Sequence, residues 1–117
     1  MTRNSSTMED QIRKGQIVAG MTFQQKVWAA TARIPRGRVM TYADLAKRLK
    51  STGYRAVGQA LHRNPYAPQV PCHRVVGSDG RLTGFAGGLA KKRRMLKEEG
   101  VSFNGERVDL RECRVVN

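Results

Sequence analysis

The segment with the clearest capacity for chemistry is Pro71-Cys72-His73-Arg74. A cysteine is nucleophilic only as its thiolate; a neighbouring imidazole can take its proton, and nearby cations can stabilise the anion. The alternative is a small buried cysteine with a histidine beside it by chance. The tetrapeptide leaves both interpretations open. Adjacent residues of a strand face opposite sides, so the pair would need a turn or a bridging water to cooperate.

Metal binding is a competing use of the same side chains. Zinc sites usually pair ligands a few residues apart, whereas the only close pair here is adjacent and no Cys-x-x-Cys is present. The sequence therefore predicts no metal, and Cys113 is expected to be structural. The candidate ligands that we considered are His62, Cys72, His73 and Cys113.

The charge of the chain points to a polyanionic partner. Its 117 residues carry 22 Lys and Arg against 9 Asp and Glu, a formal net charge of +13. Between Asp10 and Asp79 the only acidic residue is Asp44. Such a field most often serves a nucleic acid backbone. A generic basic protein is the plain alternative; an anionic membrane is disfavoured because no strongly apolar helix face accompanies the bases.

Length and composition limit the class of protein. The length suits one domain and excludes a large multi-domain enzyme. No apolar run is long enough to cross a membrane, and the first residues lack the apolar core of a secretory signal. Two cysteines are too few for a disulfide scaffold. We expect a reduced, cytoplasmic or nuclear protein.

Local signals predict the elements that hold the Cys-His pair. Capping-box patterns at Thr22–Gln25 and Thr41–Asp44 mark two helix starts. Two short helices joined by a tight turn around residues 51–53 suggest a helix-turn-helix. Gly100 is the expected C-cap of a basic helix. Helices are predicted over residues 23–33, 41–49, 54–63 and 89–99.

Short strands and turns complete the expected fold. Val39-Met40 and Arg74–Val76 are candidate strands, and Ser78–Gly80 is a turn into a hairpin or wing. Residues 101–117 suggest one or two more strands. The predicted fold class is α+β, mainly helical: a winged helix-turn-helix-like single domain with short strands. We expect residues 1–21 to form a flexible tail, with a helical turn around residues 8–17, and residues 22–117 the domain.

The expected third helix has an unusual composition. Gly58 inside a helix costs about 1 kcal/mol relative to alanine, which suggests a steric reason for it. Together with Ala56 it would permit close approach of another surface, and Arg55 at the start of the helix could enter a base stack. Close packing against a neighbouring helix is the alternative.

In this order the motifs resemble the C-terminal domain of the O6-alkylguanine-DNA alkyltransferases, over about residues 22–100 with the family's spacing kept. The ordered set is far more specific than Pro71-Cys72-His73-Arg74 alone. The matching stretches are Thr41–Leu45, Arg55–Gly58, Arg63–Pro65, Val70–Val76, Gly87–Leu89 and Leu96–Gly100.

The resemblance implies a role for each matching residue. Cys72 would accept the alkyl group, His73 would deprotonate it through a water, Glu99 would orient His73, and Asn64 would organise the turn before the cysteine. The reaction would need no cofactor. Tyr42 would crowd the phosphate of the target nucleotide, and Arg55 would fill the stack after the base is flipped through the minor groove. The other implied DNA contacts are Ala56, Gly58, Gln59, Arg63 and Arg74; the implied substrate pocket is Tyr42, Pro71, Val75, Phe85, Ala86, Gly87 and Gly88.

The chain departs from the family pattern in three ways. Only about 21 residues precede the matched part, where the family usually carries a ribonuclease-H-like domain. Gly84–Gly88 replaces the usual tyrosine and serine of the pocket with Phe85 and Ala86, so hydrogen bonds to the base are lost. The short architecture is similar to the alkyltransferase-like proteins, which bind alkylated DNA without repairing it and have Trp or Ala at the cysteine position. This chain keeps Cys72.

We therefore carry three hypotheses. The first is a single-turnover alkyltransferase, a methylated-DNA–protein-cysteine methyltransferase acting on duplex DNA that contains O6-alkylguanine. The second is a non-catalytic lesion sensor that recruits other repair, such as nucleotide excision repair. The third, a sequence-specific winged-helix regulator, is disfavoured because major-groove readers need long polar side chains. We expect a monomer with no membrane partner, cytoplasmic and nucleoid-associated, or nuclear in a eukaryote.

Overall fold

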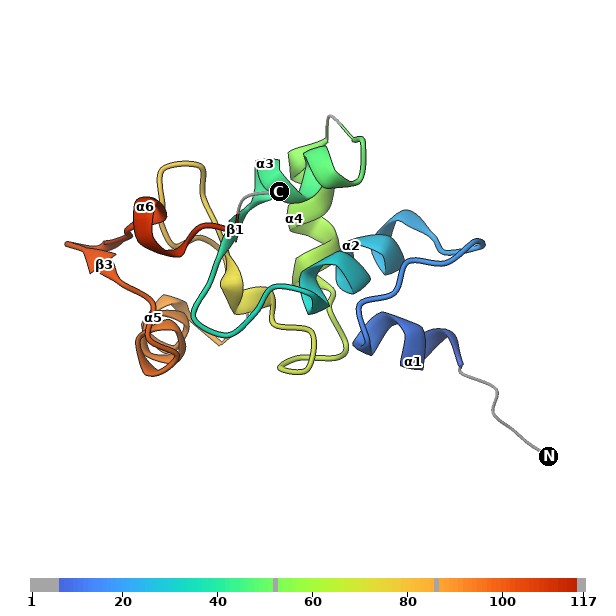
Figure 1. Ribbon diagram of the computed structural model, residues 1–117, viewed down its shortest axis with the longest axis horizontal. Coiled ribbons are helices and arrows are strands. Elements are labelled where there is room, and N and C mark those ends of the chain that lie inside the picture. Colours follow the sequence, from blue (N-terminus) through green and yellow to red (C-terminus); the bar gives the residue numbers. More distant parts are fainter. Residues whose placement is uncertain (1–6, 52, 86, 116–117) are drawn as a thin grey trace.

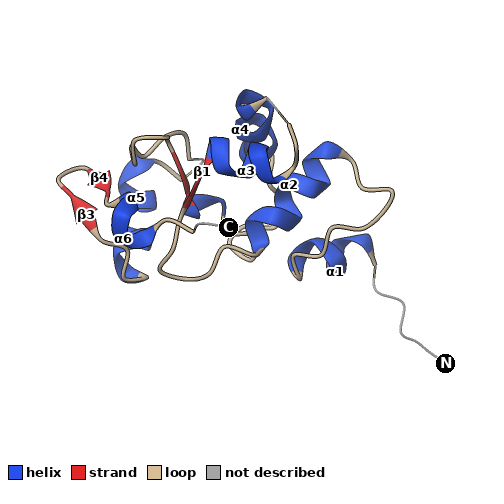
Figure 2. Ribbon diagram, turned by 45° about the horizontal axis from the view of Figure 1, so that its top comes forward, coloured by secondary structure: helices blue, strands red, loops and turns tan. Residues whose placement is uncertain are grey.

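The computed structural model describes residues 7–51, 53–85 and 87–115. These residues form short helices around two small two-stranded sheets (Figures 1 and 2). No helix among them is long and apolar enough to cross a membrane. The elements are α1 (Met8–Arg13), α2 (Phe23–Ala32), β1 (Met40–Thr41), α3 (Tyr42–Arg48), α4 (Tyr54–His62), the 3₁₀ helix η1 (Cys72–Arg74), β2 (Val75–Val76), α5 (Leu89–Glu98), β3 (Phe103–Asn104), β4 (Arg107–Val108) and α6 (Leu110–Cys113).

Capping residues determine where the central helices begin. Thr22 and Gln25 form the predicted capping box at the start of α2, with side-chain to backbone bonds of 3.1 and 2.9 Å. Thr41 and Asp44 form the second, at the start of α3. Glu99 is the C-cap of α5, and Gly100, which was predicted as the cap, follows it with φ +89°, a left-handed conformation that glycine adopts without strain. The four predicted helices are thereby confirmed, with ends that differ by about one residue.

Residues 7–21, expected to belong to a flexible tail, pack on the rest of the chain, and the helical turn expected around residues 8–17 is present as α1. Thr7 caps α1, which packs on α2, and Ile12 is fully buried. Met21 is buried in the same cluster. The described residues 7–21 are therefore part of the domain (Figure 1). The polar composition of this segment gave no sign that Ile12 and Met21 are buried. Burial of these two apolar side chains offsets the entropy that is lost when the segment is ordered.

A parallel pair of strands joins the two halves of the fold. Met40 of β1 pairs with Val75 of β2, and Thr41 with Val76. Since α3 follows β1 directly and η1 precedes β2 directly, this register holds the start of α3 close to Cys72. Behind them, Trp28 Nε1 donates a buried 2.7 Å hydrogen bond to the carbonyl of Ala60 in α4, which ties α2 to α4.

The wing lies elsewhere than predicted. Residues 78–80 do not begin a hairpin; they form a tight loop in which the Gly77 amide donates to the Arg81 carbonyl. That loop docks on β4 through a 2.9 Å bond from the Val108 amide to the Gly80 carbonyl. The antiparallel hairpin is formed by β3 and β4. Val108 is buried in the second core cluster, which explains why the pairing forms there.

Candidate active site

The short helix η1 brings the chemically active side chains together. Cys72 is partly exposed, while His73 is turned into the protein and only 3% exposed. The His73 Nε2 atom lies 2.9 Å from Oε2 of Glu99, the residue that ends α5. The 3₁₀ turn thus supplies the change of direction that a strand could not. The structure brings Cys72, His73 and Glu99 to one place, as the resemblance implied.

Arg74, a predicted DNA contact, is engaged within the protein. Its Nε and Nη2 atoms donate to the two carboxylate oxygens of Glu99, each at 2.9 Å, and Nη1 donates to the Ile34 carbonyl at 2.7 Å. A bidentate arginine–carboxylate pair of this kind is geometrically specific. With three donors engaged and its side chain 16% exposed, Arg74 fixes Glu99 from inside the protein.

The charges of this group leave His73 ready to accept a proton. Burial lowers the pKa of His73, against the opposing effect of Glu99. Burial alone would raise the pKa of Glu99, but the hydrogen bonds from Arg74 and His73 lower it overall. Glu99 is then an anion and can only accept, so Nε2 of a neutral His73 carries the hydrogen. The Nδ1 atom remains free to act as a base.

Lys92 is a functional candidate that sequence reasoning missed. It is fully buried, and its Nζ donates to the carbonyls of Val75 and Thr83, both at 2.8 Å. Burial lowers its pKa to about 8, while a negative charge on nearby Cys72 would act in the opposite direction. A signal was present in the sequence. Residues 92, 96 and 99 share one face of the helix. Since Leu96 is expected to face inward, Lys92 places a lysine on the inward face.

The lowered pKa of Lys92 makes the free energy of unfolding depend on pH. The unfolded lysine has a pKa near 10.4, so between pH 8 and 10 the unfolded state binds more protons and stability rises with pH. We expect the free energy of unfolding to increase by about 2 kcal/mol between pH 7 and 10, relative to Lys92→Met. Denaturant unfolding of both proteins at each pH measures this difference. Parallel profiles would contradict it.

A cavity of about 210 Å³ opens in front of Cys72. Phe85 and Gly87 contribute to its wall, and a Cβ on Gly87 would stand 3.0 Å from the Phe85 ring, so only glycine fits there without a shift. Asn64 also lines it and holds the preceding turn, donating to the Val70 carbonyl and accepting from the Tyr66 amide. This agrees with the organising role expected of Asn64.

Three predicted pocket residues have other positions. Val75 is buried in the core and presents its carbonyl to Lys92, so its side chain does not line the cavity. Pro71 is buried at the start of η1. Gly88 is exposed as the N-cap of α5. Ala86 lies outside the described residues. The position of Val75 could not be predicted, because the strand pattern does not distinguish a valine buried in the core from one that lines a pocket.

Tyr42 is held at the cavity by a partner that no sequence signal indicated. The Thr83 hydroxyl donates a 2.8 Å hydrogen bond to the Tyr42 oxygen, which leaves the phenol hydrogen free. Burial raises the pKa of Tyr42, against the lowering effect of Thr83. Tyr42 is therefore a neutral hydrogen-bond donor on the same cavity as Cys72.

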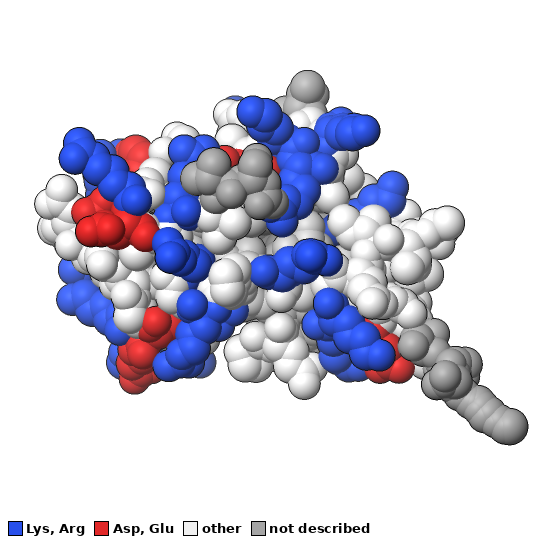
Figure 3. Space-filling view, in the orientation of Figure 1, with Lys and Arg blue, Asp and Glu red and all other residues white. Residues whose placement is uncertain are grey.

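The outer face of α4 suits close approach by another molecule. A Cβ on Gly58 would meet Tyr42 at 3.9 Å, an ordinary contact, so packing within the protein does not require glycine there. Internal packing, the alternative explanation for Gly58, is thus weakened. Figure 3 shows Lys and Arg side chains spread over one face of the molecule, with Asp and Glu at only a few places on it. The predicted DNA contacts that are exposed on or next to α4 are Arg55, Ala56, Gln59 and Arg63.

The side chains considered as metal ligands do not assemble. Cys113 lies in the second core cluster, where its Sγ accepts a 3.2 Å hydrogen bond from the Ser102 amide. His73 is bonded to Glu99. Among the residues that the structure describes, no three His, Cys, Asp or Glu side chains lie close enough to hold a metal ion.

Comparison with known proteins connects this geometry to a family. Residues 22–101 match the family model described as 6-O-methylguanine DNA methyltransferase, DNA binding domain. Methylated-DNA–protein-cysteine methyltransferase of Methanosarcina mazei is 52% identical over 81 residues, 68% of this chain and 51% of that protein. The Salmonella typhimurium protein of the same name is 50% identical over 82 residues, 69% of this chain and 48% of the other. The chain spans about half the length of these relatives.

Solved structures show the same fold. The Mycobacterium tuberculosis protein OGT in complex with DNA has a TM-score of 0.65 at 38% identity, covering 79% of this chain and 63% of its own. Schizosaccharomyces pombe Atl1, bound to damaged DNA containing O6-carboxymethylguanine, has a TM-score of 0.72 at 30% identity. That comparison covers 81% of this chain and 95% of the S. pombe chain.

Proposed function

Because this chain belongs to the 6-O-methylguanine DNA methyltransferase family, we propose that it repairs DNA by moving the alkyl group of an O6-alkylguanine onto its own Cys72. The observation that carries the proposal is the placement of Cys72 at a cavity with the buried His73–Glu99 pair directly behind it. The relatives named as methyltransferases support it. A thioether is not hydrolysed, so each molecule acts once.

The transfer is an in-line displacement at carbon. The Cys72 thiol gives its proton through a water to Nδ1 of His73, since the described contacts include no direct bond between the two side chains. The sulfur then forms a bond to the alkyl carbon as the bond from that carbon to O6 of guanine breaks. The bonding electron pair stays on the guanine, which takes up a proton. The hydroxyl of Tyr42 supplies this proton, and the proton that His73 took up returns through water to the Tyr42 oxygen.

Buried Lys92 assists this step electrostatically. Its positive charge lies close enough to Cys72 for a thiolate there to favour protonated Lys92. Its two carbonyl partners, Val75 and Thr83, hold the ammonium in place.

The target base must leave the duplex before sulfur can reach it. Unstacking costs a few kcal/mol, less for a damaged base that pairs poorly. We propose that α4 lies in the minor groove, where Ala56 and Gly58 allow close approach, and that Arg55 fills the vacated stack. Tyr42 then crowds the phosphate of the target and favours the extruded state.

Arg55→Ala is expected to weaken binding to damaged DNA about tenfold more than binding to undamaged DNA, because the side chain acts only in the flipped complex. Arg63→Ala is the matched control, since a phosphate contact lowers both affinities alike. Fluorescence anisotropy with the two duplexes, repeated over a salt series, measures both effects. Affinity should fall steeply with salt. An equal loss for the two duplexes in Arg55→Ala would reduce Arg55 to a phosphate contact.

A lesion sensor is the second candidate. Two observations favour it: the near-complete match to the short S. pombe protein, whose structure holds damaged DNA, and Phe85, which lacks the hydroxyl that the family usually offers to the base. In this role the protein would hold the flipped base and recruit nucleotide excision repair. The catalytic set Cys72, His73 and Glu99 favours transfer.

A titration separates the two candidates. Increasing amounts of protein are added to a fixed amount of duplex with one O6-methylguanine, and restored guanine is measured after nuclease digestion. The proposal predicts one guanine restored per protein molecule and no more at long times. Tight lesion-selective binding without restored guanine would support the sensor.

A further inference from the structure

Cys72 stands between two cavities, and the second has no assigned use. The first, of about 210 Å³, is lined by Tyr42 and Asn64 and suits the flipped base. The second, of about 200 Å³, is lined by Pro68, His73 and Met95. Both share Cys72 and Lys91. A group carried on O6 of a base in the first cavity would extend past the sulfur toward the second.

Lys91 is the cation where the cavities meet. Its stem lies against Gly87, where a Cβ would be 2.9 Å from Lys91 Cδ. Within the described part of the chain, no hydrogen bond or ion pair engages its ammonium group, whereas adjacent Lys92 is committed to two carbonyls. No described carboxylate side chain lines either cavity. The remaining wall of the second cavity is largely apolar, with Ala67, Pro68, Phe85 and Met95.

We propose that Lys91 makes the second cavity selective for alkyl groups that end in an anion, such as the carboxymethyl group. This rests on the proposed function and names a substrate class for it. A carboxylate beside the reacting carbon repels the incoming Cys72 thiolate, and the ammonium of Lys91 offsets that repulsion. The first turn of α5, which has no side-chain cap, adds the positive end of a helix dipole.

The structure of the S. pombe protein with O6-carboxymethylguanine shows that an anionic adduct can be bound on this fold. Burial lowers the pKa of His73, so His73 supplies no positive charge to the adduct before it takes up the thiol proton. The ammonium of Lys92 is bound to the carbonyls of Val75 and Thr83, so Lys91 is the cation that can reach the adduct directly. Lys91→Gln removes the positive charge and keeps an extended polar side chain, so this substitution tests the proposal directly.

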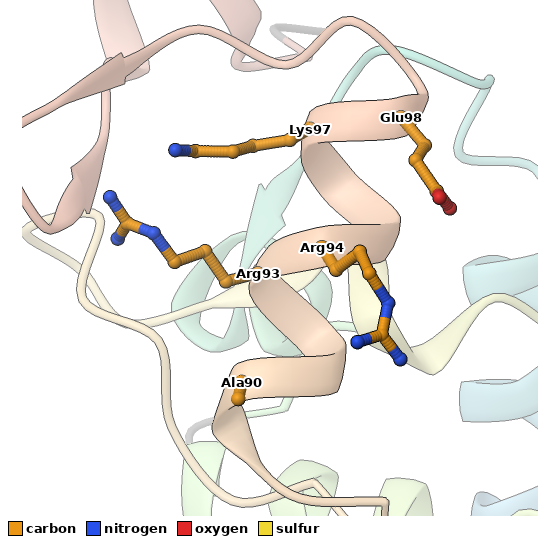
Figure 4. Close-up of a pocket in the computed structure, with 5 residues that line it drawn as sticks. All are labelled: Ala90, Arg93, Arg94, Lys97 and Glu98. Carbon is orange, nitrogen blue, oxygen red and sulfur yellow. The ribbon is translucent and has the colours of Figure 1, made fainter.

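The test uses two duplexes that carry O6-carboxymethylguanine or its uncharged carbamoylmethyl analogue. Single-turnover transfer rates and dissociation constants are measured for the wild type, Lys91→Gln and Lys97→Gln. Lys97 is the matched control: it lies on the same helix but over the Phe103 ring, 5.6 Å from its centroid. Figure 4 shows Lys97 and Arg93 extending from one side of α5 toward β3.

The wild type should prefer the anionic adduct, and Lys91→Gln should lower the anionic-to-neutral ratio about tenfold, the value of one charge-assisted hydrogen bond. Lys97→Gln should keep the wild-type ratio. An unchanged ratio in Lys91→Gln, or equal losses for both duplexes as from a phosphate contact, would overturn the proposal. If neither adduct is transferred, the proposed transferase function fails, and the ratio of dissociation constants still tests Lys91.

Discussion

Replacing Cys72 with serine is expected to abolish alkyl transfer while leaving the affinity for damaged DNA nearly unchanged. The hydroxyl has almost the same size, so the cavity keeps its shape, but an alcohol loses its proton far less readily than a thiol and is a much weaker nucleophile toward an alkyl carbon. We expect the single-turnover rate to fall by about 10³-fold or more. In the proposed complex, DNA affinity depends on α4 and the basic surface, which the substitution does not touch.

Cys113→Ser is the matched control for this result. Cys113 is buried in the second core cluster, away from the cavities that flank Cys72. It should retain transfer, with at most a loss of stability from its contact with the Ser102 amide. Rates are followed with a radiolabelled methyl group, and affinities by gel shift. Transfer by Cys72→Ser at the wild-type rate would remove Cys72 from the mechanism.

Replacing Glu99 with glutamine is expected to slow transfer by about 10²- to 10⁴-fold, the usual contribution of a positioned general base. The carboxylate holds the hydrogen of His73 on Nε2, and an amide in its place can donate to Nε2 and favour the tautomer that cannot take the thiol proton. DNA affinity should not change, because Glu99 is turned inward between His73 and Arg74.

The pH dependence of the rate separates this role from a structural one. In the wild type the rate should rise as His73 loses its proton, at a pH below the usual value for histidine because burial lowers its pKa. Glu99→Gln should lower the maximal transfer rate and shift the pH at which the rate is half-maximal. Glu98→Gln, on the exposed end of α5, should leave both values unchanged. Circular dichroism verifies folding, and His73→Gln provides an independent second variant. A normal rate in both site variants would contradict the relay.

The sequence predicted the elements whose signals are local. Thr22 and Thr41 mark helix starts because their side chains cap the backbone within three residues. The Cys72–His73–Glu99 group was predicted from the resemblance, and the structure brings its members together. The packing of residues 7–21 was not predicted, because Ile12 is buried through the contact of α1 with α2, and no local pattern in the sequence shows that contact.

The errors and omissions around the site have the same cause. Arg74 was named as a DNA contact from the resemblance, and the structure shows its guanidinium bound to Glu99, 25 residues away. Thr83 reaches Tyr42 across 41 residues. Charge and residue type give no information on such pairings, since tertiary contacts decide which donors are consumed inside the protein. Lys92 was the exception, because its place on the inward face of the predicted helix was visible.

The mass of the intact protein after reaction tests the central claim most directly. The protein is incubated with a duplex that bears one O6-methylguanine, weighed, digested and mapped. The account predicts a gain of one methylene on the peptide that contains Cys72, with unmodified guanine restored in the DNA. An unchanged mass in the presence of tight lesion-selective binding would contradict it and leave the lesion sensor as the function.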